Sequence, residues 1–468
     1  MKVKRNIIII IVSIFCMGVL NINGALSAAL PANEPWTIEL LDETASNYYP
    51  GRYVSIAHHP ITGAAYVSYY EDGYLSVAYE VEPGTGNCDN PDWNCRAVDY
   101  SNDVGMYSSI DVTWVPLIPA FLSYTKVGIS YYDSEQKSLK YAEYRSTDPD
   151  WVIQEVDDSS LDANIRGTFS SLKFTSNAVP MIGYHYFSSL PTPGFGGVKI
   201  AQYNSSGTGT GCAGEDGVNW DCWTIDSKSG YPDYGTHVSL DVDYGDTVQL
   251  AFYDSYNSEL VWAYYAGFTT SPCANSVWNC STLDGAGAVG RFVSLHAPDN
   301  NTDKLRFAYL DETTSWNKIK YAVMVGSGGN CTNAAFDCFD VDTIGDPVGN
   351  VGLDITVDKQ GYPIIAYMDA YSSISATKLK IARPAAAYGN SDGNCGEEPP
   401  GDLFLYWQCE TIDKGYQDIV NEGAFAAVSV SPSGLATIAY YEEDEYNMLG
   451  RLKVAQQHYI AFLPLIVK

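Results

Sequence analysis

The chain has 468 residues, of which 46% are hydrophobic and 13% aromatic, a content too apolar for an intrinsically disordered protein. Its formal net charge of −30 argues against a nucleic-acid-binding protein, because phosphate backbones are bound by basic patches. An acidic balance fits an exported protein kept soluble by self-repulsion, or a protein that binds cations.

The first segment, residues 1–28, is predicted to be a secretory signal peptide. Basic residues at the start precede an apolar run from Ile7 to Leu20, and small residues follow around Ser27 to Ala29. A membrane anchor is the alternative, but the run is shorter than the roughly 20 apolar residues that a spanning helix needs. We therefore expect a secreted or cell-surface protein with no membrane span in the mature chain.

The rest of the chain is organised around one short pattern, in which an aromatic residue is followed six positions later by Asp. The copies are Trp36…Asp42, Trp93…Asp99, Trp151…Asp157, Trp220…Asp226, Trp278…Asp284, Phe336…Asp342 and Trp407…Asp413. Seven copies with one fixed internal spacing indicate a repeat protein.

Three further parts recur between these copies. The first is Gly-x-aromatic-x-Ser, as in Gly51 to Ser55; the second ends in Tyr or Phe with an acid, as in Tyr131 to Asp133; the third carries an Ala, such as Ala142. All four parts are rich in β-branched and aromatic residues, alternate with period two and are bounded by turn residues, which is typical of strands. Four antiparallel strands repeated around a ring predict an all-β, seven-bladed β-propeller over residues 35–457, with a β-solenoid as the alternative.

The order of the parts predicts how the ring closes. The fourth strand appears first, at Trp36, and the last repeat stops after its third strand, near Ala455. We therefore expect the N-terminal strand to complete the last blade, an arrangement that leaves no open sheet edge.

The cysteines outside the signal peptide fall into local pairs. The pairs are Cys88/Cys95, Cys212/Cys222, Cys273/Cys280, Cys331/Cys338 and Cys395/Cys409. An even count in an exported chain predicts disulfides. Zinc is the alternative, but CxxC spacing is absent and no His recurs beside the pairs.

This layout resembles the large class of secreted bacterial β-propellers, which includes sialidase-like and lectin-like repeat proteins. The resemblance covers Trp36 to about Ala455 and is to an architecture rather than to one characterised family; the Ser-x-Asp-x-Gly-x-x-Trp box of sialidases is not found. The final segment, 458–468, is similar in its Leu463-Pro464-Leu465 motif to the short apolar tails that end many exported proteins of some filamentous bacteria.

In propellers, the loops from strand four to the next strand one and the loops between strands two and three usually form the ligand face. The seven repeat Asp residues are expected there, either as a ring of cation ligands or as caps of their turns. The acids that follow strand two, such as Asp133, carry the same two interpretations, and recurrence in every repeat favours structure.

Three arginines beside the first-strand glycines are candidate ligand-binding residues: Arg52, Arg166 and Arg291. Guanidinium groups around one channel mouth could bind a carboxylate or sulfate in bidentate fashion. The alternative is that each pairs with an acid of a neighbouring loop.

Repeat three replaces the usual Tyr-Tyr-Asp with Gly183-Tyr-His-Tyr-Phe187. His185 is therefore a candidate general base with Tyr184 or Tyr186 beside it, as proton abstraction from a uronate would require. The alternative is a hydrogen-bonded His in a variant loop, and His237, which replaces a first-strand aromatic, is expected to be packed.

No cofactor or metal site is predicted, although the polar turn Asp299 to Asp303 could hold calcium; it lacks the rest of an EF-hand loop. Two functions stay open. The favoured one is a non-catalytic binding or scaffold propeller for a glycan or an extracellular protein. The alternative is a carbohydrate-active enzyme, a lyase or glycoside hydrolase, that acts on an anionic glycan at the channel mouth.

Overall fold

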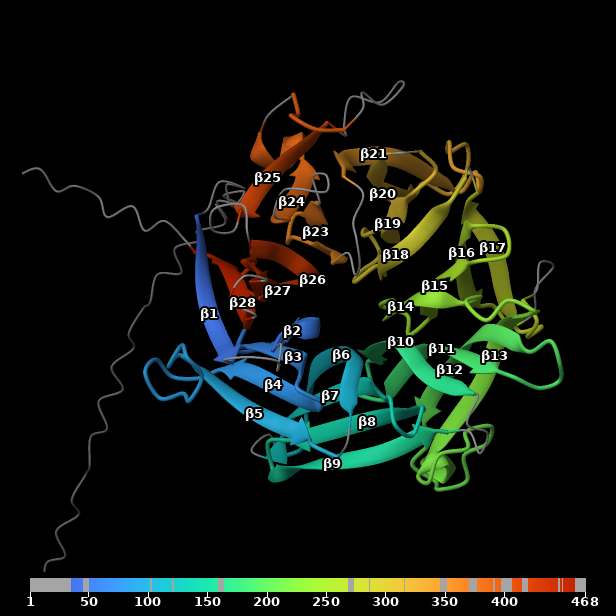
Figure 1. Cartoon of the computed structure of the whole chain (residues 1–468), viewed down its shortest axis with the longest axis horizontal. Coiled ribbons are helices and arrows are strands. Elements are labelled where there is room, and N and C mark those ends of the chain that lie inside the picture. The colour runs from blue at the N-terminus through green and yellow to red at the C-terminus, as the bar shows by residue number, and fades with distance from the viewer. Residues whose placement is uncertain are drawn as a thin grey trace, which may run out of the picture.

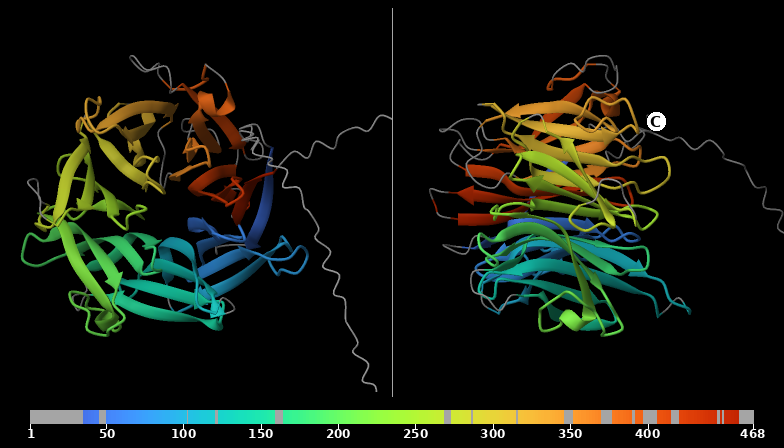
Figure 2. Two further views of the ribbon diagram at one scale, coloured as in Figure 1. Left: turned by 180° about the vertical axis from the view of Figure 1, so that it is seen from behind. Right: turned by 90° about the vertical axis from the view of Figure 1, so that its right-hand side faces the viewer.

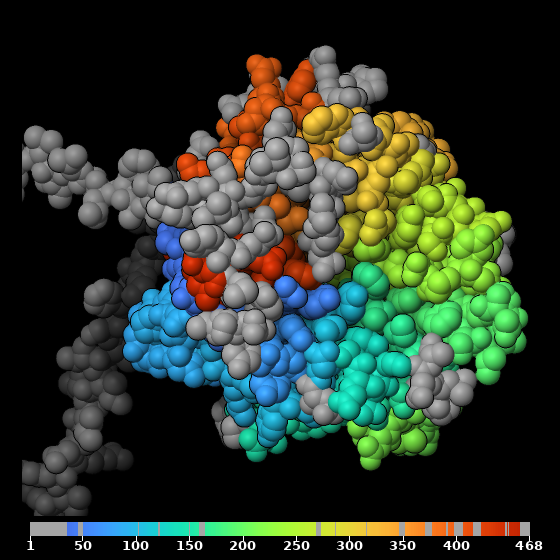
Figure 3. Space-filling model, in the orientation of Figure 1, coloured from blue at the N-terminus to red at the C-terminus, as the bar shows by residue number. Residues whose placement is uncertain are grey.

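The computed structural model describes residues 35–44, 50–101, 103–119, 122–158, 164–267, 273–285, 287–314, 316–345, 352–369, 377–389, 392–396, 406–414, 420–444, 447 and 449–458. Within them the chain forms seven four-stranded antiparallel sheets that follow one another around a ring (Figure 1), and the colours of the space-filling view follow the same order (Figure 3). The predicted all-β, seven-bladed β-propeller is confirmed, and the closed ring excludes a β-solenoid.

Each blade is given from its innermost to its outermost strand. Blades one to three are β2(Arg52–His58), β3(Ala65–Glu71), β4(Tyr74–Glu80), β5(Trp93–Asp99); β6(Val104–Val115), β7(Tyr124–Asp133), β8(Ser138–Arg145), β9(Asp148–Asp157); and β10(Ile165–Phe174), β11(Pro180–Ser188), β12(Phe195–Tyr203), β13(Trp220–Ser229). Blades four and five are β14(Thr236–Val242), β15(Val248–Asp254), β16(Glu259–Tyr265), β17(Trp278–Asp284); and β18(Val289–His296), β19(Arg306–Asp311), β20(Asn317–Met324), β21(Phe336–Ile344). Blades six and seven are β22(Leu353–Val357), β23(Pro363–Asp369), β24(Lys378–Pro384), β25(Trp407–Asp413); and β26(Val420–Val430), β27(Ala436–Asp444), β28(Leu449–Gln457), β1(Trp36–Thr44). Two short 3-10 helices, η2(Gly217–Asn219) and η3(Ala385–Tyr388), lie between strands three and four of blades three and six.

The ring closes as the order of the repeats predicts. Strand β1 pairs antiparallel with β28, from Trp36 opposite Gln457 to Thr44 opposite Gly450. The N-terminal strand is thus the outermost strand of blade seven, and both ends of the propeller meet in one sheet (Figure 1). This pairing gives the last blade its fourth strand and covers the edge of β28.

The ring has two faces, which Figure 2 shows from behind and from the side. We call the face where the innermost strands begin the front face; it carries the loops between blades and the turns between strands two and three. The face where the innermost strands end is the rear face; it carries the connections from strand one to two and from strand three to four. The innermost strands surround a central channel that runs between the two faces.

Glycine in the first-strand motif is required by close packing between blades. Gly51 and Gly167 have φ values of 105° and 102°. A Cβ at Gly51 would lie 3.0 Å from the Cα of Leu452, and a Cβ at Gly167 would lie 2.7 Å from the Cα of Leu139. Both leucines are on the third strand of the preceding blade. Any other residue would clash there and strain the backbone. The glycines therefore let each innermost strand lie against its neighbouring blade.

The aromatic residue that opens strand four also packs between blades. Trp220 contacts Tyr141 of blade two edge-on at 5.2 Å, and Trp407 contacts Tyr321 of blade five in the same way at 5.2 Å. Both tryptophans are fully buried. The cores of the molecule accordingly lie between successive blades, as with the cluster that joins β8 and β9 of blade two to blade three.

All five predicted cysteine pairs are disulfide-bonded: Cys88–Cys95, Cys212–Cys222, Cys273–Cys280, Cys331–Cys338 and Cys395–Cys409. Each joins the connection before strand four to that strand, so the disulfides lie toward the periphery and away from the channel. Five disulfides are consistent with an extracellular protein.

The predicted signal peptide, residues 1–28, and residues 459–468 of the apolar tail lie outside the described residues. In the part of the chain that the structure describes, no helix has the length and apolarity needed to cross a membrane.

Candidate functional site

The channel is narrowed by a ring of aromatic side chains, which we call the aromatic collar: Tyr53, Tyr107, Phe169, His237, Phe292 and Phe425. Neighbouring rings lie with centroids 4.5 to 4.8 Å apart, tilted by about half a right angle. All six residues adopt φ values between 52° and 56°, which aim each ring into the channel instead of along the sheet. Among the described strands, only blade six departs from this arrangement. Asp354 pairs with Ala366 as Ser294 pairs with Ala308 in blade five, and the collar residue stands two positions earlier, so blade six has Gly352 at the collar position.

His237 is a packed member of the collar, as expected from its position in the repeat. Burial lowers the pKa of His237 to about 3, and the neighbouring Arg291 adds to this effect. The imidazole is therefore neutral at physiological pH and serves as an aromatic ring. A small cavity of about 180 Å³ lies against the collar rings.

The three candidate arginines lie at the front end of the innermost strands, and each has an acidic partner. Arg52 lies 3.5 Å from Glu443, Arg166 lies 3.7 Å from Asp157, and Arg291 lies 3.0 Å from Glu312. Arg166 also donates to the backbone carbonyls of Ile165 and Phe187. Each guanidinium is thus already matched by a carboxylate of the same region, so an anionic ligand would have to compete with these partners.

His185 is buried on blade three, with 5% of its surface exposed. Its Nδ1 lies 2.8 Å from the Thr168 hydroxyl, and its Nε2 lies 2.9 Å from the carbonyl oxygen of Pro232, to which it donates. Burial lowers the pKa of His185 to about 4. Both ring nitrogens therefore have partners, and Tyr184 next to it is buried and donates to Asp157.

The structure places Arg166, His185 and Tyr186 on one blade, with the guanidinium carbon of Arg166 5.2 Å from the centre of the Tyr186 ring. Arg52 and Arg291 lie on blades one and five, each two blades away. The aromatic collar lies between these blades. The candidate residues therefore surround the front mouth of the channel as separate, individually paired groups.

The seven repeat Asp residues form clamps between blades. Each accepts a hydrogen bond of 2.6 to 2.8 Å from a tyrosine hydroxyl of the following blade or, for Asp226, of the loop that leads into it, and we call each such pair a Tyr–Asp clamp. The pairs are Tyr69–Asp42, Tyr131–Asp99, Tyr184–Asp157, Tyr234–Asp226, Tyr309–Asp284, Tyr367–Asp342 and Tyr440–Asp413. Their common role is structural, as their recurrence in every repeat suggested. The shared partner of these carboxylates is a tyrosine hydroxyl across the blade boundary, whereas the sequence suggested the backbone of the local turn.

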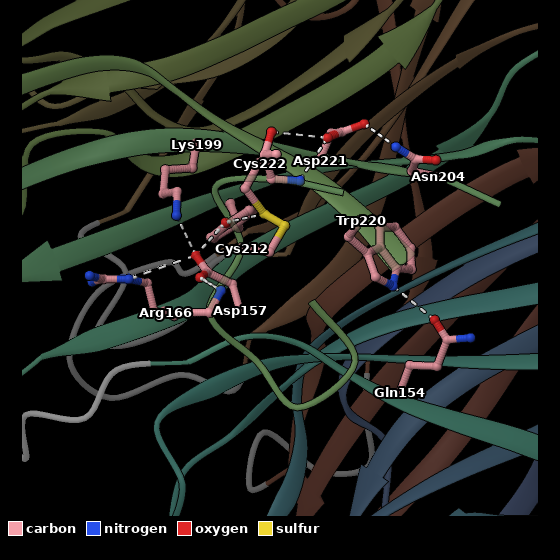
Figure 4. The surroundings of a disulfide bond; sticks show 12 residues. Gln154, Asp157, Arg166, Lys199, Asn204, Cys212, Trp220, Asp221 and Cys222 are labelled. Atoms are coloured by element: carbon pink, nitrogen blue, oxygen red, sulfur yellow. Dashed lines mark hydrogen bonds and ion pairs between the residues drawn. A yellow bond between two sulfur atoms is a disulfide. The ribbon is translucent and has the colours of Figure 1, made fainter. Parts of the chain in front are cut away.

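A lysine completes five of the clamps. Its ammonium group lies 2.5 to 3.4 Å from the clamp carboxylate, in the pairs Lys140–Asp99, Lys199–Asp157, Lys320–Asp284, Lys380–Asp342 and Lys453–Asp413. In four of them the lysine also pairs with the acid that ends strand two. Figure 4 shows the blade-three clamp, where Asp157 lies between Lys199 and Arg166 beside the Cys212–Cys222 disulfide. The lysine stands two residues before the repeat Ala, a signal that the sequence contains.

Blades one and four break this pattern. In blade one, Ser76 stands opposite Tyr69, at the position where five other blades carry the lysine. Burial and the charge of Asp42 raise the pKa of Glu71 to about 7, and burial also raises the pKa of Asp42. In blade four, Phe252 and Val261 replace the tyrosine and lysine, and Tyr234 from the preceding loop supplies the hydroxyl.

Two groups of exposed tyrosines lie on the front face, and we call them the aromatic platforms. The first is Tyr74 and Tyr100, which with Tyr70, Asp72 and Asp103 line an open cavity of about 560 Å³ between blades one and two. Tyr70 donates to Asp103 at 2.7 Å and so fixes that carboxylate beside the exposed rings.

The second aromatic platform is Tyr231 and Tyr256, at the boundary of blades three and four. The rings meet edge-on with centroids 4.7 Å apart, and the Lys228 ammonium lies 4.0 Å above the Tyr256 ring. Both platforms combine a tyrosine from an inter-blade loop with one from a turn between strands two and three.

At its rear end the channel widens into a cavity of about 960 Å³, which we call the channel well. The rear halves of the innermost strands and the loops that follow them line it, with Asp111, Lys173, Asp241 and His296 from four successive blades. The channel well opens on the face opposite to the predicted ligand face. The sequence did not indicate it, because its lining residues stand about one repeat apart along the chain.

The polar turn Asp299 to Asp303 lies at the rim of the well. His296, Asp299 and Asp303 hold ligand atoms within 4.8 Å of one another. Burial opposes ionisation of Asp303, but hydrogen bonds from His296 and Arg306 outweigh it and hold the pKa of Asp303 below its ordinary value. The carboxylate of Asp303 thus already has a cationic partner in Arg306.

Comparisons with known proteins give no family. No protein-family model matches the chain, and no curated protein matches it. Solved structures that match include an α-L-arabinanase of Penicillium chrysogenum complexed with arabinobiose (11% identity, TM-score 0.41, 90% of this chain and 98% of that chain). Another is an intramolecular trans-sialidase from Ruminococcus gnavus in complex with oseltamivir carboxylate (12% identity, TM-score 0.38, 89% and 95%). A third is a polysaccharide lyase (10% identity, TM-score 0.41, 86% and 89%). At these identities and TM-scores the likeness carries no statement about a ligand of this chain.

Proposed function

We propose that the chain is an exported, non-catalytic glycan-binding propeller whose front face holds the ligand. The observation that carries this proposal is the pair of aromatic platforms. Tyr100 and Tyr256 expose 75% and 47% of their surface, and each has a second exposed tyrosine and a charged or hydrogen-bonding group beside it. Exposed rings offer apolar faces against which sugar rings stack, while a neighbouring carboxylate accepts hydrogen bonds from hydroxyl groups.

The candidate catalytic residues support binding over catalysis. A general base needs a ring nitrogen within reach of its substrate, yet both nitrogens of His185 are engaged by Thr168 and Pro232. The pKa of His185, about 4, is also far from the value at which a base works well near neutral pH. The three candidate arginines are each matched by a carboxylate, so an anionic sugar would have to displace that partner to bind any of them.

Neutral glycans suit the aromatic platforms better than anionic ones. The protein carries a net charge of −30, and the first platform holds Asp72 and Asp103 beside its rings. A uronate or sialate would be repelled there, whereas a neutral sugar can donate hydroxyl hydrogens to the same carboxylates.

The test is a glycan array with the mature protein, followed by calorimetry on the glycans that bind. We compare the double variants Tyr74→Ala/Tyr100→Ala and Tyr231→Ala/Tyr256→Ala with Tyr244→Ala, a similarly exposed tyrosine at the rear face. Loss of stacking at the correct platform should weaken binding about tenfold or more, which corresponds to roughly 1.4 kcal/mol. Wild-type binding that neither double variant changes would reject the platforms, and an array without any bound glycan would reject the function.

A further inference from the structure

The channel well contains a charged group that makes no direct hydrogen bond within the described residues. Lys173, on the innermost strand of blade three, lies with its Nζ 3.8 Å from Oδ1 of Asp111 on one side and 3.8 Å from Oδ1 of Asp241 on the other. Both distances exceed the range of a hydrogen bond. The side chain exposes 43% of its surface, and the residue lines the well. Lys173 is therefore held between two carboxylates as ion pairs without a direct hydrogen bond to either.

The two flanking carboxylates are held rigidly. Oδ2 of Asp111 accepts the backbone N–H of Phe174 at 2.8 Å, and Oδ2 of Asp241 accepts the backbone N–H of Ala297 at 2.9 Å. Each bond crosses from one blade to the next, so the carboxylates are fixed by the packing of the propeller. Their Oδ1 atoms face the ammonium group. Groups preorganised in this way bind a ligand without loss of their own rotational freedom.

A spacing of 3.8 Å between a donor and an acceptor leaves a position for one bridging oxygen. An oxygen about 2.8 Å from both atoms fits this triangle, and a hydroxyl group can accept from Lys173 while it donates to Asp111 or Asp241. Two such positions lie on either side of one ammonium group. Two neighbouring hydroxyl groups of one molecule match them, and this arrangement is a diol.

The charge of the well selects against ions. An anion near the Lys173 ammonium would meet Asp111 and Asp241 on its two sides, and further acids, Asp299 and Asp354, also act on this group. A cation would meet Lys173 at the centre. A neutral polyol avoids both penalties, and a volume of about 960 Å³ falls in the range of roughly 300–1,000 Å³ typical of small-molecule sites.

We propose that the channel well is a second binding site, which takes a neutral polyhydroxylated ligand such as a monosaccharide or the end of a neutral oligosaccharide by seating a diol between Asp111, Lys173 and Asp241. This site goes beyond the proposed glycan-binding front face. It lies on the opposite face, and its residues are not those of the aromatic platforms. One site can therefore exist without the other.

The experiment is saturation-transfer NMR and calorimetry on the full mature chain with arabinobiose, lactose and myo-inositol, and with glucuronate as a charged comparison. At least one neutral probe should bind the wild type in the millimolar range or tighter, with glucuronate weaker. Lys173→Met should lower that affinity about tenfold or more, because it removes the charge-assisted donor. Asp241→Asn, which keeps the size of the side chain, should lower it in the same direction.

The controls separate this site from the front face and from misfolding. The Tyr231→Ala/Tyr256→Ala variant should leave binding of the small probe unchanged, and Lys173→Met should keep any array binding of the front face and the wild-type circular dichroism spectrum. No neutral probe bound by a folded wild type would overturn the proposal. Binding that Lys173→Met and Asp241→Asn both leave unchanged would also overturn it.

Discussion

Blade one contains two carboxylates, Asp42 and Glu71, without the lysine that five other blades place beside the clamp carboxylate, and this difference gives a quantitative prediction. Ser76 stands opposite Tyr69, as Lys140 stands opposite Tyr131 in blade two. Without an ammonium group, burial and the charge of Asp42 raise the pKa of Glu71 to about 7. Substituting Ser76→Lys should supply the missing cation and stabilise the protein above neutral pH.

The magnitude follows from the pKa of Glu71, about 7 against an ordinary 4.5. Since a tenfold change in a protonation equilibrium is about 1.4 kcal/mol, the unfavourable free energy of the ionised carboxylate is at most about 3.5 kcal/mol. Glu71 is only partly buried, and solvent screening reduces this figure to about 1–2 kcal/mol. The folded pKa is above the unfolded one, so stability falls as pH rises from about 4.5 to 7 and stays reduced above it.

The assay is urea unfolding of the oxidised protein at pH 4 and pH 8. Ser76→Lys should raise the free energy of unfolding at pH 8 by about 1–2 kcal/mol and change it little at pH 4. Ser76 is 1% exposed, so Glu71→Gln serves as a second variant that removes the charge without adding volume. It should stabilise at pH 8 in the same way.

Val261→Lys in blade four is the matched control. Its clamp carboxylate, Asp226, already accepts from Tyr234 at 2.6 Å and from the backbone N–H of Ala274 at 3.0 Å. A lysine there should therefore bring no comparable gain at pH 8. Two results would show that the ionised Glu71 carboxylate does not destabilise blade one. The first is an equal free energy of unfolding for the wild type and Glu71→Gln at pH 8, and the second is a gain of the same size at pH 4 and pH 8.

Two further perturbations test the clamps and the aromatic collar. Tyr131→Phe removes the hydroxyl that donates to buried Asp99 and should lower the free energy of unfolding by about 1.5–3 kcal/mol, whereas Tyr100→Phe, at an exposed ring, should have no effect in the same urea titration. Burial holds the pKa of His237 at about 3, below its ordinary 6.5, so the wild type loses stability as pH falls below 6.5. His237→Phe should lose less stability on acidification, because the variant has no imidazole to protonate. Equal slopes of unfolding free energy against pH for the two proteins would contradict this expectation.

Those features of the fold that depend on local pattern could be predicted from the sequence. The fixed spacing from Trp220 to Asp226 and its copies identified strand four, and the position of the copy at Trp36 predicted closure by β1. The disulfides were also predictable, because each joins cysteines only 7 to 14 residues apart. Each of these signals lies within one repeat or in the order of repeats.

Contacts between blades could not be predicted in the same way. Tyr131 and Asp99 stand 32 residues apart, and nothing in either local pattern states that a tyrosine of one repeat bonds an acid of the one before. In blade four the hydroxyl comes from Tyr234, in a loop outside the repeat pattern. The candidate arginines show the same limit, since their partners Glu443, Asp157 and Glu312 follow from the arrangement of loops in space.

The aromatic collar separates the front end of the channel from the channel well. Tyr53 and its counterparts lie against the small cavity near the front, while residues three to five positions later, such as Ile56 and His58, line the channel well. The rings lie in van der Waals contact around most of the channel, so a large ligand on the front face does not reach Lys173. A front face with exposed aromatic rings and a polar well with a lysine between carboxylates are therefore separate surfaces with separate chemistry. Substitutions at one end should leave binding at the other unchanged, and that independence is what distinguishes two sites from one continuous channel.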